Sequence, residues 1–179
     1  MIKKKVCMVG VCGTGKTSLV QRYVYSIFSE KYHSTVGVKI DRKLVSIGYT
    51  TVNLLLWDIE GRTSERDVPE SYLRGAHAVF FVADGTRRET FEQLFELRRL
   101  VRSAAGDVPS IVALNKADLP DQWVLTPKDT ERLRADGFLA LNTSAKTGAG
   151  VEEAFRRIAQ ATLNASPAPN PQETVSHED

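Results

Sequence analysis

The chain has 179 residues, with 24 Lys and Arg against 22 Asp and Glu, so its formal net charge is +2. This length predicts one domain with a sizeable core, and a composition of 42% hydrophobic and 26% charged residues excludes a collagen-like, disordered or membrane-spanning chain. The near balance of charge excludes a general nucleic-acid binder, so we expect no nucleic-acid partner, and two cysteines are too few for a disulfide framework, which favours a reducing, cytoplasmic location.

Apolar runs alternate with helical patterns from the N-terminus onward. Residues 6–9 form a short apolar run that is typical of a buried strand, and residues 16–26 follow a helical pattern. Two further strand candidates, 39–47 and 51–57, are separated by a turn that contains Gly48, which favours a hairpin. The first third of the chain therefore predicts a strand, a helix and a hairpin.

The same alternation continues to the end of the domain. Thr86 begins a capping-box pattern before one helix, and Thr126 precedes a proline at the start of another. The remaining elements are expected as strands at 78–82, 111–114 and 138–141 and as a last helix at 151–163. Strands that alternate with helices predict an α/β fold, with a mostly parallel sheet and helices on both faces.

The last residues differ in composition from the rest. Residues 164–179 are rich in proline and polar side chains and offer no apolar face, so we predict a domain over 1–163 followed by a disordered C-terminal tail over 164–179. No cysteine follows Cys12. We therefore expect no direct lipid anchor, because prenylation and palmitoylation both require a cysteine thiol.

A phosphate-binding motif follows the first predicted strand. The stretch 10–17 satisfies G-x-x-x-x-G-K-[ST] and opens the first predicted helix, so a glycine-rich turn that matches by chance is disfavoured. Backbone N–H groups and the helix N-terminus would surround phosphate oxygens, Lys16 would supply charge, and the Thr17 hydroxyl could bind Mg²⁺. The expected phosphate contacts are Gly13, Thr14, Gly15, Lys16, Thr17 and Ser18.

Two later segments could recognise a base. Asn115, Lys116 and Asp118 form an N-K-x-D sequence at the end of a buried strand, where α/β sheets bind ligands. The Asp118 carboxylate could accept two hydrogen bonds from guanine that adenine cannot donate, which is worth about 10²–10⁴-fold in discrimination. Ser144-Ala145-Lys146 follows the last strand, and the Ala145 N–H could meet the guanine O6. The alternatives are a polar turn and a helix-capping turn.

These motifs, with Thr35 and the Asp58–Gly61 segment between them, resemble in order and spacing the Ras-like small GTPases over roughly residues 3–163. The stretches 34–38 and 83–86 and the Trp57-Asp58 pair are similar to the Rab branch. The resemblance implies the P-loop NTPase fold, in which a mostly parallel six-stranded sheet contains one antiparallel strand. It also implies a monomer that uses GTP or GDP and Mg²⁺ as cofactors.

The resemblance further implies roles for individual residues. Thr17, Thr35 and Asp58 would bind Mg²⁺, the Gly61 N–H would contact the γ-phosphate, and Phe28 would lie against the guanine. The alternatives without a binding role are a core position for Phe28 and an ordinary loop position for Thr35. The expected catalytic positions are Lys16, Thr35, Gly61 and Arg62.

A switch mechanism then follows. Loss of the γ-phosphate would release Thr35 and Gly61, so two loops would lose their order. We expect effector, exchange-factor or activating proteins to bind the switch regions around 30–40 and 58–75.

The chain departs from the family at Arg62, where a glutamine usually orients the attacking water. Arginine has no acceptor, so we expect hydrolysis at or below the order of 10⁻³ s⁻¹. A rival hypothesis makes Arg62 a built-in arginine finger, and a third makes it a solvated loop residue. Glu60 would oppose phosphate charge unless it pairs with Arg62. The alternative function is a GTP- or GDP-bound interaction module that does not cycle.

Overall fold

The computed structural model describes residues 2–31 and 34–165. Of the predicted tail, residues 166–179 lie outside the described residues, and Asn164 is the last residue of a helix. The strands are β1 (Ile2–Gly10), β2 (Val38–Ile47), β3 (Thr50–Ile59), β4 (Ala78–Asp84), β5 (Ser110–Asn115) and β6 (Leu139–Asn142). The helices are α1 (Lys16–Tyr25), α2 (Glu70–Leu73), α3 (Arg88–Ala105), α4 (Pro127–Ala135) and α5 (Val151–Asn164), with a 3₁₀ turn at Pro120–Gln122.

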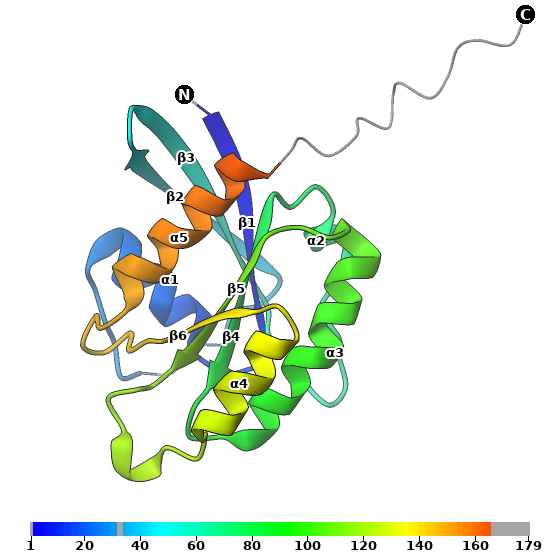
Figure 1. Ribbon diagram of the computed structural model, residues 1–179, viewed down its shortest axis with the longest axis vertical. Helices are drawn as coiled ribbons and strands as arrows, with labels where there is room; N and C mark the ends of the chain where they lie inside the picture. The colour runs from blue at the N-terminus through cyan, green and yellow to red at the C-terminus, as the bar shows by residue number, and fades with distance from the viewer. Residues whose placement is uncertain (1, 32–33, 166–179) are drawn as a thin grey trace, which may run out of the picture.

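The six strands form one sheet in the order β2-β3-β1-β4-β5-β6. Only β2 and β3 are antiparallel, as a hairpin whose turn begins at Gly48 with φ +58°, and the other neighbours run parallel. Helices cover both faces of the sheet (Figure 1). The predicted α/β fold with one antiparallel strand is confirmed.

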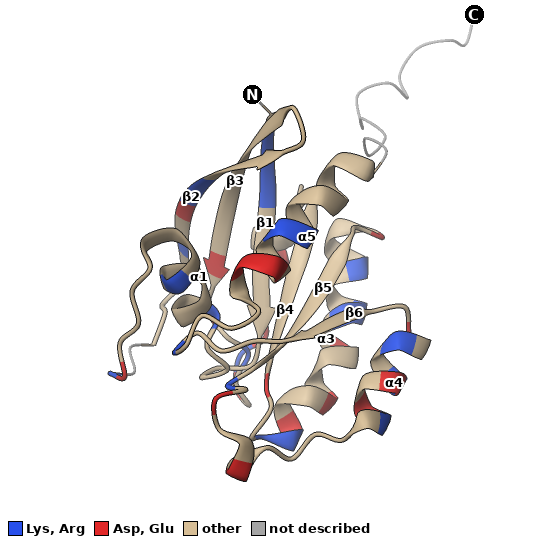
Figure 2. Cartoon of the chain, turned by 60° about the vertical axis from the view of Figure 1, so that its left-hand side comes forward, with Lys and Arg blue, Asp and Glu red and all other residues tan. Residues whose placement is uncertain are grey.

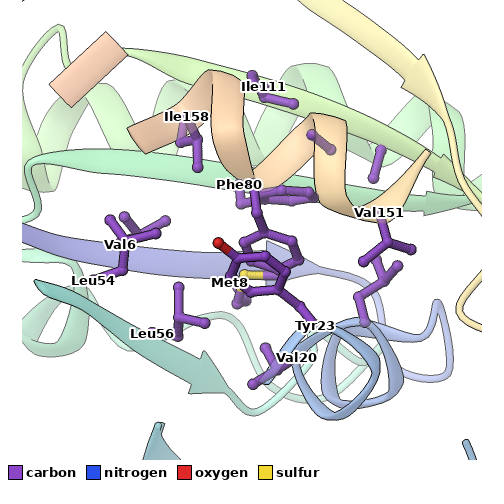
Figure 3. Packing of buried hydrophobic residues seen from close by; sticks show 14 of the residues in the cluster. Val6, Met8, Val20, Tyr23, Leu54, Leu56, Phe80, Ile111, Val151 and Ile158 are labelled. Atoms are coloured by element: carbon purple, nitrogen blue, oxygen red, sulfur yellow. The ribbon is translucent and has the colours of Figure 1, made fainter. Parts of the chain in front are cut away.

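Alternating side chains of the central strands build one apolar cluster on each face of the sheet. Phe80 of β4 points toward α1 and α5, where Phe155 lies 4.7 Å from it between ring centroids and stacks on Tyr23 at 4.1 Å. Figure 3 shows this cluster around Met8 and Phe80. The next residue, Phe81, packs in the second cluster with α3 and α4. Burial on both faces explains the continuous apolar run of β4.

Charged residues occur on helices, strands and loops, including Lys39 and Arg42 within β2. Basic and acidic residues both occur along α3 and α4 (Figure 2). Arg88 of α3 forms an ion pair with Asp129 of α4 at 2.8 Å, and Asp129 also completes the capping box that starts α4 at Thr126. This pair fixes α4 against α3. Within the described residues, no helix has the length and apolar composition needed to cross a bilayer.

The strand β1 and the helix α2 are among the features that differ from the prediction. The strand β1 begins at Ile2 rather than at residue 6, because three lysines extend its exposed end, where Lys5 packs over the Trp57 ring at 3.7 Å. The four-residue helix α2 was also missed, since its apolar periodicity is too short to detect and only Leu73 is buried. Neither difference alters the sheet. The parallel strands bring Gly10, Asp84 and Asn115 to one edge.

Candidate functional site

The phosphate motif forms the turn between β1 and α1. Gly13 and Gly15 adopt φ +78° and +99°, which favour glycine, and a Cβ on Gly15 would lie 2.3 Å from the Asn115 side-chain nitrogen. Gly15 is the residue before the first helical turn, so the helix N–H groups face the same side as the turn. Glycine at position 15 therefore lets the turn pass directly against Asn115.

Lys16 lies inside the turn and is only 5% exposed. Its Nζ donates to the Val11 carbonyl at 3.1 Å and lies 3.4 Å from the Gly10 carbonyl. Burial lowers the pKa of Lys16 to about 8, although the nearby Asp58 carboxylate opposes that shift. An anion in front of the ammonium would stabilise its charged form.

A cavity of about 660 Å³ extends from this turn to the end of β5. Most of the predicted contacts line it together: Gly13, Gly15, Lys16, Thr17, Ser18, Phe28, Thr35, Gly61, Asn115, Lys116, Asp118, Ala145 and Lys146. Thr14 is fully buried behind the turn, and its hydroxyl donates to the Val11 carbonyl. The volume is within the usual range of small-molecule ligand sites.

Three oxygen-bearing side chains meet beside Lys16. The Thr17 hydroxyl lies 2.7 Å from the Thr35 hydroxyl and donates to Asp58 Oδ2 at 2.6 Å, and the Thr35 hydroxyl lies 3.5 Å from the same oxygen. Asp58 is 1% exposed, and its Oδ1 is buried with no hydrogen-bond partner. Burial raises the pKa of Asp58, while the Thr17 hydrogen bond and Lys16 act in the opposite direction.

These oxygens fit a Mg²⁺ ion. Mg²⁺ prefers one or two carboxylate or hydroxyl oxygens together with phosphate oxygens and water. A cation would also give Asp58 Oδ1 a partner and offset the cost of burying the carboxylate. Within residues 2–31 and 34–165, no group of three or more His, Cys, Asp or Glu side chains gathers to bind a metal.

Asn115 connects the two ends of the cavity. Its Nδ2 donates to the Thr14 carbonyl at 3.0 Å, and its Oδ1 accepts from the Thr143 hydroxyl at 3.2 Å and from the Ala145 N–H at 3.3 Å. The side chain is 1% exposed, so these bonds form away from water. Asn115 therefore fixes the phosphate turn relative to the loop after β6.

Asp118 and Ser144 also belong together. The Ser144 hydroxyl donates to Asp118 Oδ1 at 2.6 Å and accepts from the Thr147 N–H at 3.0 Å. Asp118 and Ala145, which both line the cavity, are thereby positioned by one loop. Ser144 contributes through this hydrogen bond and does not line the cavity.

Two lysines of the site have acidic partners that the motifs did not predict. Lys116, at φ +68°, forms an ion pair with the buried Asp84 at 2.6 Å, and Lys146 forms one with Glu30 at 3.0 Å. Asp84 is the last residue of β4, so the end of a buried apolar strand is the signal that could have found it. Phe28 packs on the core cluster and also lines the cavity, so it has features of both alternatives considered for it.

Gly61 lies against the phosphate turn. A Cβ on Gly61 would lie 2.6 Å from both the Cα and the N of Cys12 and 2.7 Å from Lys16 Nζ. The backbone of the next residue forms a β-bridge to the turn, in which Cys12 N donates to the Arg62 carbonyl at 2.9 Å and Arg62 N donates to the Gly10 carbonyl at 3.0 Å. Glycine at position 61 is required for this approach.

The side chain of Arg62 points away from the cavity and toward α3. Its Nη1 donates to Gln93 Oε1 at 2.6 Å and to Glu96 Oε2 at 2.8 Å, and its Nε lies 3.4 Å from an oxygen of Asp67. Glu60 does not pair with Arg62. Its carboxylate instead accepts from the Gly37 N–H at 3.0 Å and contacts Arg66 at 3.4 Å.

Related sequences align with nearly the whole chain, at about one third identity. The chain matches the family described as "Ras family" over residues 5–164. It is 34% identical over 178 residues to "Ras-related protein Rab-1" of Theileria parva, which covers 96% of this chain and 81% of the relative. It is 36% identical over 164 residues to "Ras-related protein Rab-4B" of Homo sapiens, with 89% of this chain and 76% of the relative covered. "Ras-related protein Rab-1A" of Dictyostelium discoideum is 33% identical over 174 residues, or 96% and 86% of the two chains.

Proposed function

The chain belongs to the Ras family of GTP-binding molecular switches, and from that premise we propose that it binds GTP and GDP with Mg²⁺ in the cavity described above and hydrolyses GTP slowly. In this proposal the phosphate groups lie in the turn before α1, and the base lies at Asp118. Mg²⁺ is held by Thr17, Thr35 and Asp58. Mg²⁺ would neutralise charge on the phosphates.

The observation that supports this proposal best is the connection made by Asn115. One buried amide bonds both the phosphate turn at Thr14 and the loop that presents Ala145. A ligand that spans the cavity would therefore meet a phosphate site and a base site at a set separation. That arrangement suits a nucleotide, and the carboxylate of Asp118 suits the two N–H donors on one edge of guanine.

Slow hydrolysis is proposed because of Arg62. A water-orienting side chain needs an acceptor, which arginine lacks, and this guanidinium is bound by Gln93 and Glu96 outside the cavity. Replacing Arg62 by glutamine would supply an acceptor at the same backbone position. We expect Arg62→Gln to raise the single-turnover hydrolysis rate by at least about threefold, whereas a tenfold fall would favour the rival hypothesis of an arginine finger at Arg62.

The switch would act through contacts between its two loops. Glu60 bonds Gly37 twice, through its backbone N–H to the Gly37 carbonyl at 2.7 Å and through its carboxylate to the Gly37 N–H. Thr35 lies next to the proposed Mg²⁺ site. We propose that effectors, exchange factors or activating proteins recognise the stretches 30–40 and 58–75, of which residues 32–33 lie outside the described residues.

A second candidate function is a nucleotide-bound interaction module that does not cycle. The hydrogen bond of Arg62 to α3 favours this second candidate. Arg62 is at the position that usually orients the attacking water, and its side chain lies outside the cavity. Both candidates predict guanine nucleotide in the purified protein, identified by mass analysis after denaturation.

The fate of loaded GTP separates the two candidates. Slow cycling predicts conversion to GDP with a half-time of about ten minutes or longer, from a rate on the order of 10⁻³ s⁻¹ or below. The non-cycling module predicts that GTP stays intact for hours. Purified protein that binds neither GTP nor GDP in the presence of Mg²⁺ would contradict both.

A further inference from the structure

Arg87 brings a guanidinium to the phosphate turn. Its Nη1 lies 3.3 Å from the Cys12 carbonyl oxygen, to which it donates, and its Nε donates to Glu89 Oε1 at 2.9 Å. Arginine has five N–H donors, so these two bonds leave donors for a further partner. The side chain is 37% exposed, and its guanidinium can turn without breaking a buried network.

The point that Arg87 reaches is one end of the cavity. Cys12, Gly61 and Lys16 line it there, and a Cβ on Gly61 would lie within 2.7 Å of both the Cys12 backbone and Lys16 Nζ. In the proposed function, the γ-phosphate lies between the lysine ammonium and the Gly61 N–H. The Arg87 guanidinium therefore lies beside the Cys12 carbonyl, next to the expected position of the γ-phosphate.

The backbone of Arg87 is fixed by the sheet. Arg87 N donates to the carbonyl of Asp84, the last residue of β4, at 3.0 Å, and its own carbonyl accepts from the Thr90 hydroxyl at 2.8 Å. Gly10, which begins the phosphate turn, pairs with Val82 of the same strand. The start of the Arg87 side chain and the turn are thus held together by neighbouring strands, while its guanidinium remains adjustable.

We infer that Arg87 is a catalytic arginine that acts in cis on GTP, and this inference rests on the proposed function. During hydrolysis a water oxygen bonds to the γ-phosphorus, and the bond from that phosphorus to the β–γ bridging oxygen breaks. The bridging oxygen retains the electron pair as part of GDP, and one water proton passes to the released phosphate. The Arg87 guanidinium moves from the Cys12 carbonyl to the phosphate oxygens and stabilises the charge that develops there.

The contrast with Arg62 supports this assignment. Arg62 follows Gly61 directly, yet its guanidinium bonds Gln93 and Glu96 of α3. Arg87 is 25 positions further along the chain but contacts the turn itself. We therefore assign the remaining slow hydrolysis to Arg87, the arginine whose side chain contacts the phosphate turn.

The test compares Arg87→Ala and Arg87→Lys with the full-length wild type. Arg99→Ala is the matched control, because Arg99 is an exposed arginine on α3, the helix that Arg87 precedes. Single-turnover hydrolysis is followed by chromatography of GTP and GDP, and the affinities for both nucleotides are measured separately. We expect Arg87→Ala to lower the rate constant by about tenfold or more with both affinities within twofold of the wild type, and Arg99→Ala to match the wild type.

A second measurement distinguishes a catalytic from a structural role. GDP with Mg²⁺ and fluoroaluminate imitates the transferring phosphoryl group, so wild-type protein should form this complex and Arg87→Ala should not. Lysine keeps the positive charge but lacks the planar guanidinium, which can donate two parallel hydrogen bonds. The hydrolysis rate of Arg87→Lys should therefore stay at least about fivefold below that of the wild type.

Three outcomes would overturn the inference. An unchanged hydrolysis rate in Arg87→Ala would be consistent with the proposed function but would show that Arg87 takes no part in hydrolysis. A parallel loss of rate and of both affinities would make Arg87 a support of the phosphate turn only. A wild type that binds no guanine nucleotide would overturn the proposed function, and this inference with it.

Discussion

Replacing Asn115 by alanine should weaken the fold and nucleotide binding together. The substitution removes three buried hydrogen bonds, to Thr14, Thr143 and Ala145, and leaves the Thr14 carbonyl and the Ala145 N–H without that partner. A neutral hydrogen bond contributes about 1 kcal/mol net, and an unsatisfied buried group costs about 1–3 kcal/mol. We therefore expect the free energy of unfolding to fall by about 3 kcal/mol.

The assay is urea unfolding at a fixed, saturating concentration of GDP and Mg²⁺, with the GDP affinity of each variant measured in parallel. Bound ligand adds RT ln(1 + [L]/Kd) to the apparent stability, so this contribution is subtracted before the variants are compared. The affinity itself should fall by at least about tenfold, because the phosphate turn and the base loop lose their common support.

Asn53→Ala is the matched control. Asn53 is also a buried asparagine, at 9% exposure in β3, but its Oδ1 has no hydrogen-bond partner, so its removal should cost less than about 1 kcal/mol. The reasoning would be refuted if Asn115→Ala were no less stable than Asn53→Ala and still bound GDP within threefold of the wild-type affinity.

Three further predictions concern the base site, the core and the pH dependence of stability. Asp118→Ala should reduce the preference for GTP over ATP by at least about tenfold in competition experiments, because the carboxylate that accepts from guanine is lost, and an unchanged preference would contradict that role. Phe155→Ala should lower the free energy of unfolding in urea by about 3–5 kcal/mol, since the ring is fully buried against Phe80, and a loss below 1 kcal/mol would contradict this packing. Arg88 holds the pKa of Asp129 well below its usual range, so the carboxylate adds stability that is present above the unfolded pKa of about 3.9 and is lost as the pH falls through the folded value. The stability difference between wild type and Asp129→Asn should therefore shrink when the pH is lowered from 7 to below 4, and a difference that stays constant would argue against the ion pair.

The parts of the site that local sequence could predict are those built from consecutive residues. The phosphate turn is one stretch between a strand and a helix, so its glycines, Lys16 and Thr17 are recognisable without a structure. The alternation of strands and helices likewise brings Asn115 and Ala145 to the same edge of a parallel sheet. Both follow from short-range pattern and from the direction of the strands.

The parts that could not be predicted depend on which side chains meet in space. The sequence left open whether Glu60 pairs with Arg62, two residues away, and in the structure Arg62 instead reaches Gln93 and Glu96 on α3. Arg87 was no candidate for the site, because its nearness to Cys12 results from the pairing of β1 with β4. Charged side chains are long and flexible, so their partners are selected by tertiary packing rather than by their place in the chain.

The most direct test of the central claim is competition between GTP and ATP for the purified protein. A fluorescent GDP analogue is bound in the presence of Mg²⁺ and displaced by increasing concentrations of either triphosphate. A phosphate turn coupled to a guanine-specific carboxylate predicts that GTP displaces the analogue at a concentration at least about 100-fold lower than ATP does. Equal displacement by the two nucleotides, or displacement by neither, would contradict the account.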